Sequence, residues 1–272
     1  MARFVRIEEF GGPRVLRIEH DEQPQAARGE VRVRVHSAGL NPVDWKIFKG
    51  GPAAATYNAV PPCGNGNDFS GVIDEVGSGV KGFAVGDAVF GGKRMHAQAD
   101  WVVIAASRIM LKPDGLPFEQ AGSLDIAGRT AWASTRSLAL TAADTVLVSA
   151  AAGGVGVLAS QLALRAGATV VGTASEANHE FLRGLGVIPV AYGEGLLDRL
   201  RQAAPTYTAA LDNAGPITID VAPRSRSTLP SSSACRGRVS IRLRPAVIAP
   251  TWASPVSVGR TPDRENSLSW QT

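Results

Sequence analysis

The chain has 272 residues, of which 44% are hydrophobic, with 28 Lys and Arg against 24 Asp and Glu. This apolar content supports a folded core and excludes a disordered chain, and the length fits one large or two ordinary domains. Its two cysteines, Cys63 and Cys235, lie far apart in the sequence, so neither a disulfide framework nor a cysteine-rich zinc site is indicated and a reducing cytoplasm is favoured.

The basic excess is concentrated in one part of the chain. Residues 222–272 hold eight arginines, no lysine and two acids, so residues 1–221 carry slightly more acidic than basic groups. A near-neutral body argues against nucleic-acid binding. Charges interrupt the first residues and no apolar run reaches membrane-spanning length, so we expect neither a signal peptide nor a membrane segment.

The first third of the chain predicts short strands separated by turns. Residues 31–35 alternate Val and Arg, which is typical of a strand with one buried and one solvated face. Frequent glycines in the following segments indicate a compact antiparallel unit with sharp corners, similar to a barrel. Strands are predicted at residues 4–7, 14–18, 30–35 and 72–76, and residues 83–90 predict a turn and another strand.

Polar residues follow the third of these strands. Pro42 disfavours a helical conformation at Asn41, so a short helix is expected to begin after it. Asn41 and Asp44 stand at a strand end, where functional sites are commonly built. Asn41 also fits a helix N-cap, and the sequence leaves the two roles open.

The most informative stretch is residues 146–163. A β-branched and aliphatic run is followed by small residues and then by apolar residues at helical spacing, the order of a dinucleotide-binding βαβ unit. Ala151 takes the place of the first glycine of the G-x-G-x-x-G pattern, and Gly153 and Gly156 are the second and third. Bare backbone at a helix N-terminus admits a pyrophosphate, although a tight structural turn selects the same residues.

Further strands and helices continue this alternation. Strands are predicted at residues 168–173 and 187–192, a further strand with its loop at 208–215, and a helix over 177–185. After Val221 the composition changes abruptly to Arg, Ser and Pro, with one further possible strand at residues 237–241. We expect much of residues 222–272 to be irregular.

Four segments together carry a family resemblance. Residues 38–46, 67–80, 86–89 and 149–163 resemble the zinc-independent branch of the medium-chain dehydrogenase/reductase superfamily, nearest to the quinone oxidoreductase-like, NADPH-dependent reductases. The motifs occur in the family's order over residues 1–221. The resemblance implies an α/β fold in which a GroES-like β-barrel catalytic domain (1–122) precedes a Rossmann domain with a doubly wound parallel sheet (123–221). Residues 222–272 form an atypical or truncated Arg/Ser/Pro-rich tail.

The resemblance also implies site residues in a cleft between the domains. Asn41 and Thr130 would donate hydrogen bonds to the substrate oxygen, although the Thr130 hydroxyl has the alternative of bonding back to a helix carbonyl. Trp45 and Tyr57 would wall a flat acceptor, unless they are simple packing residues. The expected cofactor-binding residues are Ala151, Gly153, Gly154, Val155, Gly156, Thr173, Ser175, Tyr192 and Asn213.

No metal is expected. The Gly-His-Glu position of the zinc-dependent branch reads Gly66-Asn67-Asp68 here, and the four histidines are scattered without ligand spacing. Asp68 is expected to brace its own loop through backbone N–H groups. At the second strand end, Thr173 and Ser175 are neutral and leave room for a 2′-phosphate, which favours NADPH over NADH, although Glu176 lies close by.

The implied function is a cytoplasmic, NADPH-dependent oxidoreductase that reduces a quinone, enone or enal, with a possible homodimer formed through Rossmann edge strands. The rival is a catalytically impaired nucleotide-binding protein with a structural or regulatory role. A third, weaker possibility is a nucleic-acid or membrane-surface contact through the arginine-rich tail. We expect that residues 222–272 do not complete the family fold. A shifted reading frame near Ala222 would explain the abrupt change in composition.

Overall fold

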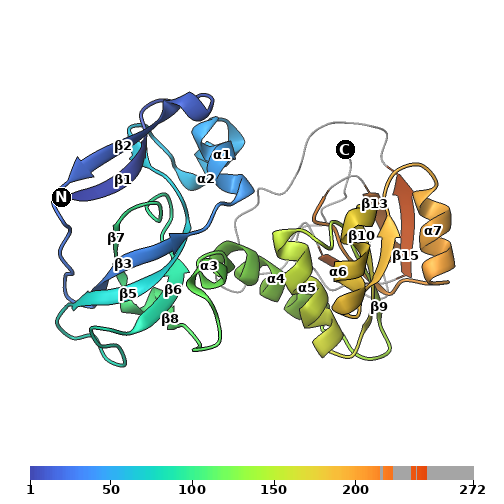
Figure 1. Cartoon of the computed structure of the whole chain (residues 1–272). Helices are drawn as coiled ribbons and strands as arrows, with labels where there is room; N and C mark the ends of the chain where they lie inside the picture. The colour runs from blue at the N-terminus through green and yellow to red at the C-terminus, as the bar shows by residue number, and fades with distance from the viewer. Residues whose placement is uncertain (215–216, 223–233, 237, 244–272) are drawn as a thin grey trace, which may run out of the picture.

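The computed structural model describes residues 1–214, 217–222, 234–236 and 238–243. Figure 1 shows two lobes joined by α3 and α4. No described helix is long and apolar enough to cross a membrane. The first lobe contains β1 (Ala2–Ile7), β2 (Leu16–Asp21), β3 (Glu30–Ala38), α1 (Pro42–Phe48), α2 (Pro52–Tyr57), β4 (Cys63–Gly64), β5 (Asp68–Val76), β6 (Ala88–Gly92), β7 (Trp101–Ala105), β8 (Ile109–Leu111) and α3 (Phe118–Ala121).

The first lobe is built from antiparallel sheets with the orders β7-β3-β5-β6-β8 and β2-β1-β4. Register shifts between Arg32 and Val33, and between Val35 and Ser37, curl the pairing of β3 with β5. Val31 and Val33 are fully buried in the core of the larger sheet, as their alternation predicts. The predicted strand at residues 14–18 begins only at Leu16, because Pro13 opens a 3₁₀ turn that ends at Val15.

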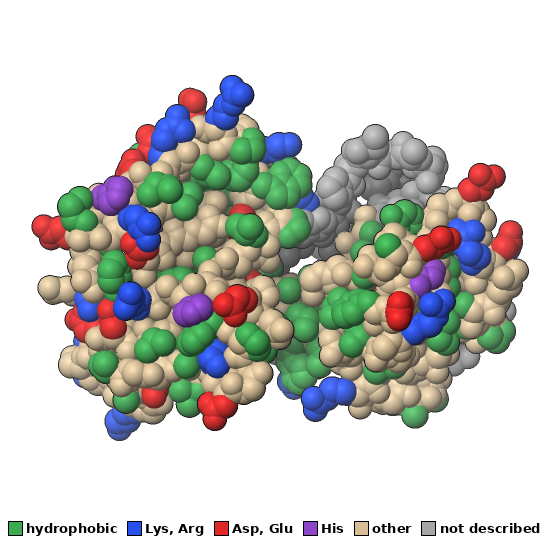
Figure 2. Space-filling view, viewed as in Figure 1, with side chains coloured by type: hydrophobic (Ala, Val, Ile, Leu, Met, Phe, Trp, Pro, Cys, Tyr) green, Lys and Arg blue, Asp and Glu red, His purple; other side chains and the backbone are tan. Residues whose placement is uncertain are grey.

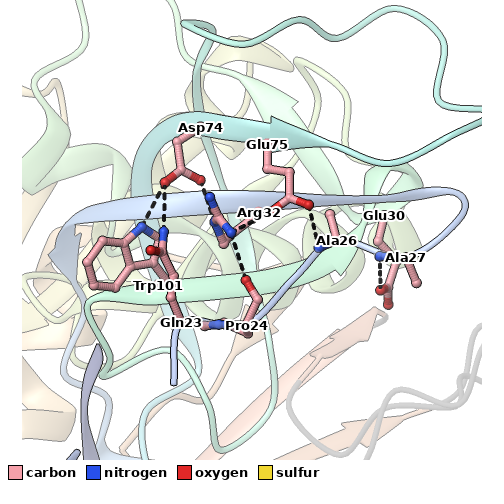
Figure 3. A network of polar contacts seen from close by, with 9 residues as sticks. All are labelled: Gln23, Pro24, Ala26, Ala27, Glu30, Arg32, Asp74, Glu75 and Trp101. Atoms are coloured by element: carbon pink, nitrogen blue, oxygen red, sulfur yellow. Dashed lines mark hydrogen bonds and ion pairs between the residues drawn. The ribbon is translucent and has the colours of Figure 1, made fainter. Parts of the chain in front are cut away.

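An ion-pair network stabilises one end of this sheet (Figure 3). Arg32 on β3 donates from Nε to Asp74 Oδ1 at 2.8 Å and forms a second ion pair with Glu75, both on β5. Its Nη1 also donates to the carbonyl of Pro24 at 2.9 Å, and Trp101 Nε1 on β7 donates to Asp74 at 2.8 Å. The network thus ties three adjacent strands to the segment that precedes β3.

The second lobe is built around a mostly parallel sheet with helices on both faces. Its elements are α4 (Leu124–Leu138), β9 (Thr145–Val148), α5 (Gly154–Arg165), β10 (Thr169–Ala174), α6 (His179–Gly184), β11 (Ile188–Ala191), α7 (Leu196–Ala203), β12 (Ala209–Leu211), β13 (Ile217–Ala222), β14 (Ala234–Arg236) and β15 (Arg238–Leu243).

Alternate residues of β9 divide the core of this lobe. Val146 and Val148 pack with α4, α5 and α6, whereas Leu147 faces the other side with Leu196 and Leu200 of α7. Full burial of one such side chain is worth about 1.5–3 kcal/mol. The βαβ prediction is confirmed. The helix expected over 177–185 begins at His179, because Glu176–Asn178 forms a 3₁₀ turn.

The sheet order is β11-β10-β9-β12-β14, in which β9, β10, β11 and β12 run parallel and β14 pairs antiparallel with β12. β13 pairs antiparallel with β15, and β15 confirms the strand predicted near residues 237–241. The rest of the tail predicted to be irregular lies outside the described residues.

Candidate active site between the two lobes

The turn after β9 is shaped by close backbone packing. Ala150 has a positive φ of 47°, and the N–H of Ala151 donates to the Thr173 carbonyl at 2.9 Å. A Cβ at Gly156 would lie 2.1 Å from the Ala150 carbonyl oxygen, so only glycine lets α5 approach the turn. The third glycine of the predicted pattern therefore has a packing requirement.

The first turn of α5 is open by contrast. Gly153 and Gly154 are exposed, and a Cβ at Gly154 would meet only Ala127 of α4, at 4.0 Å. The N–H groups of Gly154, Val155 and Gly156 stand in the first turn, where an α-helix offers them no internal acceptor. Unpaired donors beside open space at a helix N-terminus fit the pyrophosphate of a dinucleotide.

The structure places Thr173 and Ser175 differently from one another. Thr173 is buried and its Oγ1 accepts from the Ala150 N–H at 3.2 Å, so this hydroxyl supports the turn. Ser175 is half-buried and accepts from Asn178 at 3.0 Å. Ser175 and Tyr192 follow paired strand ends, since Ala174 of β10 is in register with Ala191 of β11, and Tyr192 is 62% exposed.

Ser149 is a residue that the sequence analysis did not single out. It is fully buried, and its Oγ donates to Asp212 at 2.6 Å and accepts from the N–H of Asn213 at 2.7 Å. The Asn213 amide also donates to the Ser149 carbonyl at 3.1 Å. Ser149 thereby fixes the loop after β12 beside the dinucleotide turn; its only sequence signal is a polar residue that closes an apolar run.

In the first lobe, a polar cluster formed by Asn41, Asp44, Asn67 and Asp68 lies at the start of α1 and β5. Asn41 is the N-cap residue of α1, and the Asp44 carboxylate accepts from the Asn41 backbone N–H at 2.7 Å. Asp44 also accepts from the Asn67 amide at 2.5 Å. The Asn41 Nδ2 atom is buried without a hydrogen-bond partner among the described residues, so capping leaves this donor unused.

Asp68 is fully buried, and its role differs from the expected one. Its Oδ1 accepts the backbone N–H of Ile126, on α4, at 3.1 Å, so it braces the linking helix rather than its own loop. Its Oδ2 has no hydrogen-bond partner among the described residues. Burial raises the pKa of Asp68 to about 7, and the nearby Asn41 amide and the Ile126 N–H partly offset this rise.

Tyr57 lies beside this cluster and Trp45 does not. Burial raises the Tyr57 pKa, with smaller contributions from nearby carboxylates including those of Asp44 and Asp68, while the Arg94 guanidinium lies 4.2 Å from the ring centroid. Trp45 is 43% exposed on the outer side of α1, with Lys49 Nζ 4.8 Å from its ring centroid. Only Tyr57 of the two predicted wall residues is therefore placed with the polar cluster.

Helix α4 connects both parts of the site. Ile126 contacts Asp68, and the next residue, Ala127, faces Gly154 at the dinucleotide turn. Asp125 is buried against Gly92 of the first lobe and pairs with Arg129. The Thr130 hydroxyl donates back to the Ile126 carbonyl at 2.7 Å, the alternative that its helical position allowed. Figure 2 shows that the molecule is narrower between the two lobes.

The described residues contain no group of three His, Cys, Asp or Glu side chains that could hold a metal ion. The Asn67 amide at the position of a zinc-ligating histidine is instead used to hold Asp44. The absence of bound zinc stays a prediction.

Comparisons with known proteins agree with this geometry. Residues 27–114 match the alcohol dehydrogenase GroES-like domain family. Human quinone oxidoreductase is 36% identical over 179 residues, which cover 64% of this chain and 53% of the human protein. The chain thus spans about half the length of the curated relatives it matches.

Solved structures give the same grouping. The quinone oxidoreductase from Coxiella burnetii is 35% identical with a TM-score of 0.71, over 79% of this chain and 69% of that one. The Escherichia coli quinone oxidoreductase complexed with NADPH is 29% identical with a TM-score of 0.66, over 74% of this chain and 62% of that one. The chain belongs to the quinone oxidoreductase-like medium-chain dehydrogenase/reductase family, which confirms the predicted family and fold class.

Proposed function

We propose that the chain is an NADPH-dependent oxidoreductase that transfers a hydride to a quinone or an α,β-unsaturated carbonyl compound. The observation that carries this proposal is the first turn of α4, which contacts the dinucleotide turn through Ala127 and the polar cluster through Ile126. A cofactor held at α5 would therefore lie near polar groups of the other lobe. The NADPH in the E. coli relative supports the choice of cofactor.

The residues of this chain would bind the cofactor, orient the acceptor and polarise its oxygen, while NADPH supplies the hydride. Gly153, Gly154 and the first N–H groups of α5 would hold the pyrophosphate, with Tyr192 and Asn213 at the two ends of the cofactor. The unused Asn41 Nδ2 donor would hydrogen-bond to the acceptor oxygen as it gains negative charge. The Thr130 hydroxyl would be a second donor to this oxygen once it no longer donates to the Ile126 carbonyl.

The function is tested by NADPH oxidation with 1,4-benzoquinone, using the full chain and following absorbance. We expect quinone-dependent turnover that a chelator leaves unchanged, and metal analysis without stoichiometric zinc. NADPH binding without oxidation would refute the proposed reaction and favour the alternative, a nucleotide-binding protein with a structural or regulatory role.

Cofactor preference is tested separately by fluorescence titration. We expect tighter binding of NADPH than of NADH, because Thr173 and Ser175 at the end of β10 are neutral and no carboxylate at these positions repels a 2′-phosphate. Glu176 is exposed in the following turn. Equal or tighter binding of NADH would show that Glu176 binds the ribose hydroxyls.

A further inference from the structure

Two buried polar atoms of the cluster are left without hydrogen-bond partners among the described residues. They are Nδ2 of Asn41, on the N-cap of α1, and Oδ2 of Asp68, at the start of β5. One is a donor and the other an acceptor, and leaving a buried polar group without a partner destabilises the folded state. Such a cost requires an explanation in a folded protein.

Backbone contacts bring together the segments that carry these two atoms. Gly39, two residues before Asn41, donates its N–H to the Asp68 carbonyl at 2.9 Å. A Cβ at Gly39 would lie 2.4 Å from the Gly122 carbonyl oxygen and 3.1 Å from Asp68 Cβ, so only glycine lets the three segments meet. The Asn41 amide is near enough to the Asp68 carboxylate to lower the pKa of that carboxyl, although the two side chains form no hydrogen bond in this structure.

We propose that Asp68 is a positioning residue, whose ionised carboxylate accepts one N–H of the Asn41 amide and so directs the other N–H at the acceptor oxygen. The inference rests on the proposed function, in which Asn41 is the donor. Asp68 is itself anchored, because its Oδ1 accepts the Ile126 N–H from α4. The orientation of the amide is thereby set from the helix that links the lobes.

The charged groups around Asp68 determine when it can act. Asp44 on α1 and Asp125 on α4 both disfavour its ionised form, and Tyr57 of α2 is coupled to the same carboxylates. Arg129 is paired with Asp125 and Arg94 lies over Tyr57. With a pKa of about 7, Asp68 changes charge in the neutral range, so Asn41 would be oriented above this pH and released below it.

The first test is the pH profile of kcat and of KM for NADPH, between about pH 5 and about pH 9. We expect wild-type kcat to rise through an ionisation near pH 7 with little change in KM. Asp68→Asn keeps an oxygen for the Ile126 N–H but cannot ionise, so its kcat should be about tenfold lower and lack this ionisation. Asp68→Glu should retain the ionisation.

Asp144→Asn is the matched control, since Asp144 is a buried carboxylate that immediately precedes β9, at the opposite end of that strand from the dinucleotide turn. Its pH profile should match that of the wild type. Full kcat and an unchanged profile in Asp68→Asn would overturn the proposal.

The second test does not depend on turnover or on a folded variant. The side-chain amide signal of Asn41, followed by nitrogen-15 NMR in the wild-type protein without cofactor, should shift with pH near neutrality. A signal that does not shift would overturn the proposal. A shifting signal in a protein that binds NADPH but reduces no quinone would support the Asp68–Asn41 coupling and refute the proposed function instead.

Discussion

Strand β5 carries carboxylates at both of its ends, and their surroundings differ. Asp74 and Glu75 pair with Arg32, and Asp74 also accepts from Trp101. Asp68, six residues earlier on the same strand, faces other carboxylates and keeps one oxygen without a partner among the described residues. A carboxylate that has a cation and donors serves stability, whereas an uncompensated buried carboxylate marks a candidate functional position.

The largest expected effect is on catalysis, at the uncompensated end. Asn41→Ala removes the donor proposed to stabilise the charged oxygen, so turnover should fall about 100-fold. NADPH affinity should stay unchanged, because the cofactor residues lie in the other lobe. Gln161→Ala removes an exposed amide on α5 and is the control. Unchanged turnover in Asn41→Ala would exclude this residue from the site.

Removal of the Asp68 charge, at the start of β5, should raise the stability of the protein. In the unfolded chain Asp68 has a pKa near 3.8, and in the folded chain about 7. Protonated Asp68 thus favours folding below about pH 4, and this contribution is lost as the pH rises through about 7. Asp68→Asn should remove that dependence and be more stable than wild type above pH 7, by about 2 kcal/mol. Urea unfolding at several pH values measures it, and a less stable variant at high pH would contradict it.

At the other end of β5, where Arg32 compensates the carboxylates, substitution should lower the free energy of unfolding. Arg32→Met leaves Asp74 and Glu75 without their shared cation, and unfolding should become easier by about 2 kcal/mol, less than for a fully buried pair. Turnover should stay the same. Arg17→Met, on the exposed strand β2, should change little and is the control. An Arg32→Met variant as stable as the wild type would mean that the network contributes no stability.

The smallest effect concerns the third strand of the same network. Trp101→Phe keeps an aromatic ring but removes the Nε1 donor to Asp74, so stability should fall by about 1 kcal/mol. Thermal unfolding should show this loss in the wild-type background. In the Arg32→Met background, a loss of the same size would show that the two residues act independently.

Local patterns predicted much of the fold. The alternation at residues 31–35 corresponds to β3, Pro42 begins α1, and the glycine turn separates β9 from α5. These signals work because period, proline geometry and glycine packing act within a few residues. Strands β7 and β8 and helix α7 were not predicted, and the start of β2 was displaced by a 3₁₀ turn.

The site could be predicted only in part, because its contacts join distant segments. The glycine turn and the neutral end of β10 were recognised from their motif. The approach of Asn41 to Asp68 depends on the bond from Gly39 to Asp68, and the anchor of Asp68 is an N–H from Ile126, 58 residues further on. Ser149 likewise acts through a loop that follows another strand. No local sequence pattern encodes contacts between segments that are so far apart in the chain.

The direction of β14 has a consequence for how the chain tolerates change. Since Ala234 is in register with Leu211, β14 begins beside the residue at which β12 ends, at the end of the sheet that also carries Ser149 and the dinucleotide turn. A parallel neighbour would instead begin at the opposite end of the sheet, after a crossover. A longer connection between β12 and β14 would therefore leave their register intact, and each doubling of a flexible connection costs only about 0.6 kcal/mol. The chain can thus change in length between these two strands without a change in how they pair.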